Sequence, residues 1–201
     1  MKPFLLTLCL MLGFKANAQT YKDSILRHRQ HYKEEFISEE RSPLKENDTS
    51  YLRFFKPDSK YRVLATFMPT PESKEFDMPT YSGKKKMYKQ YGILTFRVNN
   101  KKCSLLVYQS QTLINDPKYK DHLFVPFTDG TTYKTTYGGG RYIDLLTTDI
   151  QGNKVIVDFN KAYNPYCAYA DGYNCPIPPV ENRLGIAIKA GEKLFGRETK
   201  H

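Results

Sequence analysis

The spacing of apolar residues divides the chain into a helical front and a longer region with strand periodicity. Thr20 and Asp23 suit the start of a helix. The apolar residues that follow recur at helical spacing, at Ile25, Leu26, Tyr32, Phe36 and Ile37. This pattern predicts a helix over about residues 21–40, which ends before Pro43.

From Tyr61 onward the period changes to two, which is typical of strands with one buried face. The expected strands are 61–67, 84–88, 93–98, 103–107, 123–127, 136–146, 155–159 and 184–190. The lysines at 84–86 suit the protection of a sheet edge. We therefore predict a mainly β fold, an antiparallel β-sandwich or partly open barrel over about 51–192, with one N-terminal helix.

The first 18 residues have the features of a signal peptide. Lys2 precedes an apolar run at 4–14, and Ala16 and Ala18 form a small-x-small cleavage site before Gln19. The run is too short to span a bilayer, which takes about 20 apolar residues, and no later segment qualifies. The sequence predicts an exported protein, periplasmic or extracellular and not membrane-spanning, with a single β-rich domain at 19–201.

The charge balance favours anionic partners without naming one. Removing residues 1–18 removes Lys2 and Lys15, which lowers the formal net charge from +10 to +8. An anionic envelope ligand would suit this charge, and so would a basic surface that binds nothing. Nucleic acid is not expected, because the chain carries none of the recognised binding motifs.

Three cysteines remain after the predicted cleavage. Cys167 and Cys175 enclose a seven-residue loop that contains Gly172, and an exported protein meets an oxidising environment. A metal site would need a second cysteine pair or a nearby histidine, and the sequence offers neither. We predict a disulfide between these two residues, no metal, and a buried free thiol at Cys103.

The segment 137–160 reads as a hairpin with polar residues on one face. The expected register places Ile143 opposite Phe159 and Asp144 opposite Asp158. Two opposed carboxylates repel each other unless a cation, a shared proton or a basic side chain compensates. Two interpretations stay open: a polar ligand site, or an ion-paired network that holds an irregular loop on the sheet.

The candidate site residues come from this hairpin and from the proline-rich segment after it. They are Arg141, Asp144, Asp158, Asn160, Tyr163, Asn164, Glu181 and Asn182. We expect four of them, Arg141, Asp158, Asn160 and Glu181, to converge in one polar cluster. The favoured function is non-catalytic binding of a small polar or glycan ligand. The alternatives are a hydrolase that uses Asp144, Asp158 or Glu181, and a structural envelope protein.

Other motifs give weaker indications. The run Gly138–Gly140 suits a β-bulge, or an anion cradle beside Arg141, but it lacks the lysine and helix of a P-loop. His28 and His31 lie three apart on the predicted helix and are expected to face solvent. No cofactor is predicted, because neither a dinucleotide fingerprint nor a nucleophile elbow is present.

The densest motifs lie between 124 and 192. They are Thr136-Tyr137-Gly138, Gly140-Arg141, Asp158-Phe159-Asn160, Ala162-Tyr163-Asn164-Pro165, Cys167, Cys175-Pro176, Pro178-Pro179, Glu181-Asn182 and Ala190-Gly191-Glu192. Over this region the chain resembles a largely bacterial, uncharacterised family, domain of unknown function 1684. The family has no assigned activity, so the resemblance implies no residue roles.

Overall fold

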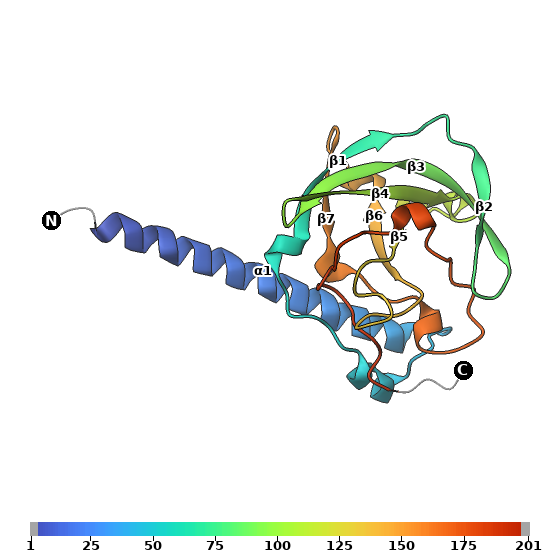
Figure 1. Ribbon diagram of the computed structural model, residues 1–201. Helices are drawn as coiled ribbons and strands as arrows, with labels where there is room; N and C mark the ends of the chain where they lie inside the picture. The colour runs from blue at the N-terminus through green and yellow to red at the C-terminus, as the bar shows by residue number, and fades with distance from the viewer. Residues whose placement is uncertain (1–3, 198–201) are drawn as a thin grey trace.

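The computed structural model describes residues 4–197, with side chains from residue 19 onward. It contains one long helix and seven strands (Figure 1). Their bounds are α1 Phe4–Ser38, β1 Arg62–Pro69, β2 Glu75–Pro79, β3 Lys85–Val98, β4 Lys101–Ser110, β5 His122–Phe127, β6 Arg141–Leu146 and β7 Lys154–Asp158. The side chains of the predicted signal peptide, residues 1–18, lie outside the described ones, and its cleavage stays a prediction.

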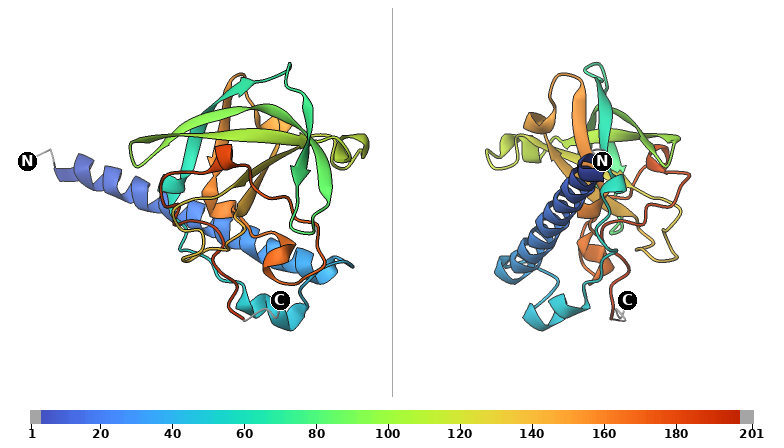
Figure 2. Two further views of the ribbon diagram at one scale, coloured as in Figure 1. Left: turned by 45° about the vertical axis from the view of Figure 1, so that its right-hand side comes forward. Right: turned by 90° about the vertical axis from the view of Figure 1, so that its left-hand side faces the viewer.

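The strands form one antiparallel sheet in the order β6-β5-β4-β3-β1-β7, and β2 pairs with the outer part of β3. The sheet curls into a half-barrel, as the two views of Figure 2 show. The prediction of a mainly β fold with a partly open barrel is therefore confirmed. The segment 75–79, which forms β2, is a strand that the sequence did not predict.

The predicted hairpin between β6 and β7 is wrong. β6 pairs with β5, with Ile143 opposite Val125, and β7 pairs with β1. As a result Asp144 lies opposite Phe124 rather than Asp158. The alternation of apolar residues shows which face of a strand is buried. It does not show which other strand pairs with it.

The main core lies on the inner face of the curled sheet. Alternate residues of six strands contribute to it, among them Phe67, Leu105 and Phe127. Leu184 and Ile188 of the C-terminal segment pack into the same core. The segment 184–190 does not form the strand we predicted. The carbonyls of Ile188 and Ala190 accept hydrogen bonds from the Arg141 side chain, so a neighbouring strand cannot use them in the same way.

The helix α1 ends close to the predicted position but begins much earlier, at Phe4. Ile25 and Phe36 are buried against the domain, whereas Leu26 and Ile37 are about half exposed. Figure 1 shows the C-terminal half of α1 running beneath the strands while its N-terminal part extends beyond them. Among the described residues, no helix has both the length and the apolar character needed to cross a membrane.

Candidate functional site

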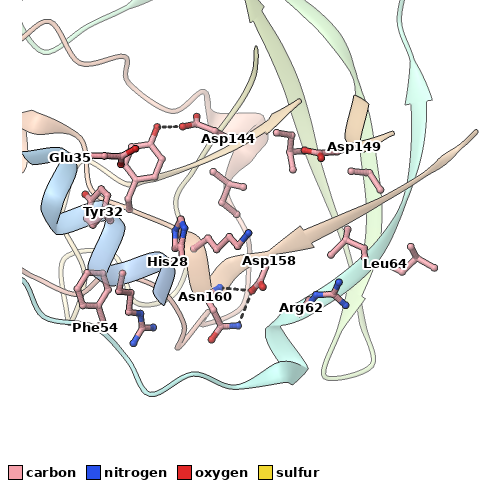
Figure 3. Close-up of a pocket in the computed structure, with 18 of the residues that line it drawn as sticks. His28, Tyr32, Glu35, Phe54, Arg62, Leu64, Asp144, Asp149, Asp158 and Asn160 are labelled. Atoms are coloured by element: carbon pink, nitrogen blue, oxygen red, sulfur yellow. Dashed lines mark hydrogen bonds between the residues drawn. The ribbon is translucent and has the colours of Figure 1, made fainter. Parts of the chain in front are cut away.

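A cleft of about 800 Å³ lies between the outer edges of β6 and β7. Residues of α1 close one side of it, and the start of β1 contributes to another (Figure 3). In that view His28, Tyr32 and Glu35 stand on the helix side, and Arg62 and Leu64 stand on the β1 side. The cleft is thus the seam of the incompletely closed barrel.

Arg29 is the most unusual residue of the cleft wall. Its side chain is only 9% exposed, and its guanidinium lies 4.6 Å from the ring centre of Phe54. Two of its nitrogens, Nε and Nη2, are buried without a hydrogen-bond partner. Burial lowers the pKa of Arg29 to about 10, which leaves the residue charged at neutral pH. A buried charge without a partner is costly and rare in proteins.

Of the three aspartates that line the cleft, Asp144 and Asp158 are held on opposite walls. Asp144 of β6 accepts the Tyr163 hydroxyl at 2.8 Å and lies 3.0 Å from His122 Nε2. Asp158 of β7 accepts the hydroxyl of Tyr21 at 2.9 Å and the backbone N–H of its neighbour Asn160 at 3.0 Å. Both carboxylates are already engaged by groups of the chain itself.

The cleft lining carries four Lys or Arg side chains and four carboxylates. The two other acids also have partners: Asp149 accepts the Leu146 amide at 2.8 Å, and Glu35 lies 3.4 Å from His31. In the described part of the chain, neither Arg29 nor three further basic residues of the lining forms an ion pair. These three are Arg62, Lys154 and Lys161. The cleft therefore contains basic side chains that no carboxylate of the chain contacts directly.

His28 lies beside these basic groups. Burial is the main cause that lowers its pKa, and the nearby charge of Lys161 adds to the effect. The expectation that His28 faces solvent is wrong, since the residue lines the cleft and is partly buried. His31, in contrast, is exposed as expected. A neutral imidazole at this position can donate or accept a hydrogen bond.

Of the eight predicted site residues, four line the cleft: Asp144, Asp158, Asn160 and Tyr163. The other four, Arg141, Asn164, Glu181 and Asn182, have their own surroundings elsewhere. The expected convergence is therefore only partial, because Asp158 and Asn160 bond to each other while Arg141 and Glu181 lie apart from them.

Arg141 is completely enclosed in the interior. It donates to Asp129 Oδ2 at 2.6 Å and to the carbonyls of Ile188 and Glu192 at 3.0 and 3.2 Å. Burial lowers the pKa of Arg141, and the charge of Asp129 opposes that shift. This residue fastens the C-terminal segment to β6, which is a structural contribution.

Asn164 belongs to a second enclosed network, around Glu192. The Glu192 carboxylate accepts the Asn164 amide at 2.9 Å and the hydroxyls of Tyr169 and Tyr32 at 2.7 and 3.1 Å. Burial raises the pKa of Glu192 to about 7, against the opposing effect of these hydrogen bonds. Tyr32 also lines the cleft, so this network supports the helix wall from behind.

Asn182 and Glu181 lie on the far part of the sheet. The Asn182 amide group bonds to Leu106 N and O at 2.7 and 2.9 Å, and to Pro126 O at 2.7 Å. It thereby links β4 to β5. Glu181 is exposed, and its charge adds to the burial that raises the pKa of Tyr108.

The disulfide between Cys167 and Cys175 is present, with Cα atoms 6.2 Å apart, and Cys103 is a buried free thiol. Both cysteine predictions agree with the structure. The run Gly138–Gly140 forms a turn before β6 rather than a bulge within the strand. At Gly140, with φ of +84°, a Cβ atom would lie 2.6 Å from the Phe127 carbonyl oxygen.

Sequence reasoning missed the residues that α1 and β1 bring to the cleft. Arg29 carried a usable signal, because it lies four residues after Ile25 and seven before Phe36, on the apolar stripe of the helix. A basic side chain on such a stripe is neutralised either by a carboxylate of the chain or by a bound ligand. Arg62 and Leu64 carried no comparable signal, since they occupy ordinary outward positions of a strand.

Comparisons with known proteins identify a family and give no activity. The family described as "Protein of unknown function (DUF1684)" matches residues 48–193. The chain is also similar to an uncharacterised protein of Haloarcula marismortui with a solution NMR structure. The two are 32% identical with a TM-score of 0.63, over 91% of this chain and 95% of the other. No curated protein matches.

Proposed function

The chain belongs to the family of proteins of unknown function DUF1684, and we propose that its seam cleft binds an anionic ligand without catalysis. The observation that carries this proposal is Arg29, a residue of the cleft lining whose buried guanidinium has two nitrogens without hydrogen-bond partners. A ligand anion would supply the missing partner. Arg62 and Lys161 add positive charge in the same space.

The proposal includes the cell compartment. We infer that residues 1–18 direct export and that the domain acts outside the cytoplasm. The disulfide is compatible with that setting. Catalysis gains no specific support, because the carboxyl group with a pKa near 7, Glu192, is fully buried and does not line the cleft.

The test compares two helix variants that each remove one positive charge. Arg29→Gln alters the cleft, and Arg27→Gln alters an exposed position two residues earlier on α1. The probe is inorganic phosphate, titrated while backbone amide signals are followed by NMR. We expect saturable shifts at His28, Asp158 and Lys161 in the wild type and in Arg27→Gln, and their loss in Arg29→Gln.

Stability gives a second readout. If Arg29 serves to bind a ligand, its buried charge lowers the free energy of unfolding of the ligand-free protein. Arg29→Gln removes that charge, so the variant should unfold at the same or a higher urea concentration than the wild type. A purely structural Arg29 would make the variant less stable. Equal phosphate binding in the wild type and Arg29→Gln would overturn the proposal.

A further inference from the structure

The free edge of β7 turns backbone hydrogen-bonding groups toward the cleft. The amide of Phe67 in β1 donates to the carbonyl of Asn153 at 2.8 Å, which fixes the bonded positions of this strand pair. Bonded residues alternate along an antiparallel pair, so the odd-numbered residues of β7 face β1. The N–H and C=O groups of Ile156 and Asp158 therefore point to the free edge.

The same alternation holds for β6 on the opposite wall. Tyr142 exchanges two backbone hydrogen bonds with Tyr163, at 2.9 and 3.1 Å, so the even-numbered residues of β6 face outward. The backbone amide of Leu146 donates a hydrogen bond to Asp149 Oδ2. Asp144 lies between these two positions, and its backbone groups point into the cleft.

The open stretch of β7 is short and well bounded. Lys154 bonds to Gln151 in both directions, so the open positions are Ile156 and Asp158. Two such positions lie about 6.8 Å apart along a strand. An extended peptide has the same two-residue repeat in its own N–H and C=O groups. Neither a sugar chain nor an acyl chain provides such groups at this repeat.

We propose that the ligand of the cleft is an extended peptide that adds to the free edge of β7 and places a carboxylate at Arg29. This inference rests on the proposed function, since it assigns a chemical class to the same anionic ligand. Edge addition supplies affinity through backbone bonds and specificity through alternate side chains. Leu64 and Ile156, which are 64% and 41% exposed and opposite each other in register, offer an apolar contact for one such side chain.

The position of α1 sets the direction of this occupant. The end of β7 nearest α1 carries Asp158, which bonds to Tyr21 of the helix, and Arg29 lies on the same helix. A peptide that runs along the edge toward α1 would therefore bring its terminal carboxylate to the helix side of the cleft, where Arg29 lies. An acidic side chain at that position would provide the same chemistry.

The probe is an equimolar library of acetylated L-pentapeptides with free C-terminal carboxylates, followed by NMR. We expect the amide signals of Ile156, Asp158 and Asp144 to shift on titration. A C-terminally amidated library should bind about tenfold more weakly, with residual binding from peptides that carry acidic side chains. A library with methylated backbone nitrogens should cause no shift at these three residues.

Two variants of one position isolate the backbone group. Ile156→Pro removes an N–H that points to the free edge, so it leaves the ladder with β1 intact. Ile156→Thr keeps the N–H and the β-branched shape. Peptide binding should fall about tenfold or more in the proline variant relative to the threonine variant. If the proline variant does not fold, the N-methylated library tests the same hydrogen bonds.

The outcomes separate the two proposals. Phosphate binding without peptide binding, or equal binding of the N-methylated library, overturns the peptide and leaves the anion site. Shifts of the same amides by chitotriose instead of peptide would also overturn the peptide. If phosphate, peptide and sugar all fail to bind, the proposed function fails and the further inference falls with it.

Discussion

Arg29 and Arg141 are both buried arginines, and they differ in what surrounds them. Arg141 has Asp129 and several backbone carbonyls as partners, whereas Arg29 has the face of Phe54 and two nitrogens without partners. The sequence singled out Arg141 because it lies in a dense polar motif. Residue type alone could not show that its partners lie within the chain, since those partners arrive from distant segments.

Glu192 offers a test at the residue scale through the pH dependence of stability. Its pKa is about 7 in the folded protein, above the ordinary value of 4.5. Between these values the folded chain holds a proton that the unfolded chain releases, so the wild type loses stability as pH rises from about 4.5 to 7. The loss should approach roughly 3 kcal/mol and then level off.

The variant Glu192→Gln resembles the protonated form and should lack this loss. Urea unfolding at several pH values between 4.5 and 8 should show the wild type falling relative to the variant across that window. Glu181→Gln is the matched control, because this carboxylate is exposed. Parallel profiles for the wild type and Glu192→Gln would show that the Glu192 carboxyl is not protonated by its surroundings.

At the scale of elements, the sequence predicted most strands and their buried faces but not all their partners. The alternation at 61–67 and 123–127 is realised in β1 and β5, and the hairpin of β3 and β4 is confirmed. The pairing of β6 with β7 was wrong because alternation carries no information on which apolar strand lies next to it. Short loops favour the pairing of consecutive strands, yet these two form the opposite edges of the sheet.

The junction of β4 and β5 supports a second prediction. One residue pair, Tyr108 opposite Phe124, records their register, and the buried Asn182 side chain bonds to Leu106 and Pro126 on the two strands. Asn182→Ala removes three hydrogen bonds and leaves buried backbone groups unpaired. We expect a loss of at least about 3 kcal/mol in the free energy of unfolding, measured with urea.

Glu181→Ala is the matched neighbour, and its exposed side chain should change stability by no more than about 0.5 kcal/mol. If Asn182→Ala is as stable as Glu181→Ala, the clamp between β4 and β5 contributes nothing measurable. A selective loss of ligand binding in Asn182→Ala, without a loss of stability, would instead restore Asn182 as a site residue.

At the scale of the whole molecule, the cleft exists because the barrel stops short of closure. β6 and β7 are the two edge strands of the sheet, and α1 covers one side of the gap. The sequence predicted a partly open barrel and a helix, and it placed Asp144, Asp158, Asn160 and Tyr163 among the site residues. It could not place the helix on the seam, because that depends on sheet curvature, which no local pattern encodes.

Removal of the predicted signal peptide, residues 1–18, should leave the folded domain intact. Exported protein should have the intact mass of a chain that begins at Gln19. The described side-chain contacts of α1 start at Gln19 with Asp23 and at Tyr21 with Asp158. A chain that begins at Gln19 keeps both of these contacts, and its Tm should lie within about 2 °C of the full chain.

A chain that begins at Ser24 is the matched comparison, since it also lacks Tyr21. It loses the bonds of the Tyr21 hydroxyl to Asp158 and Asn160, which hold α1 against the end of β7. Hydrogen bonds to a charged group contribute about 1.5–3 kcal/mol, so the Tm should fall by about 5 °C or more. If the two shortened chains melt together, Tyr21 does not hold the helix. A chain from Gln19 that melts well below the full chain would show that residues 1–18 belong to the folded domain.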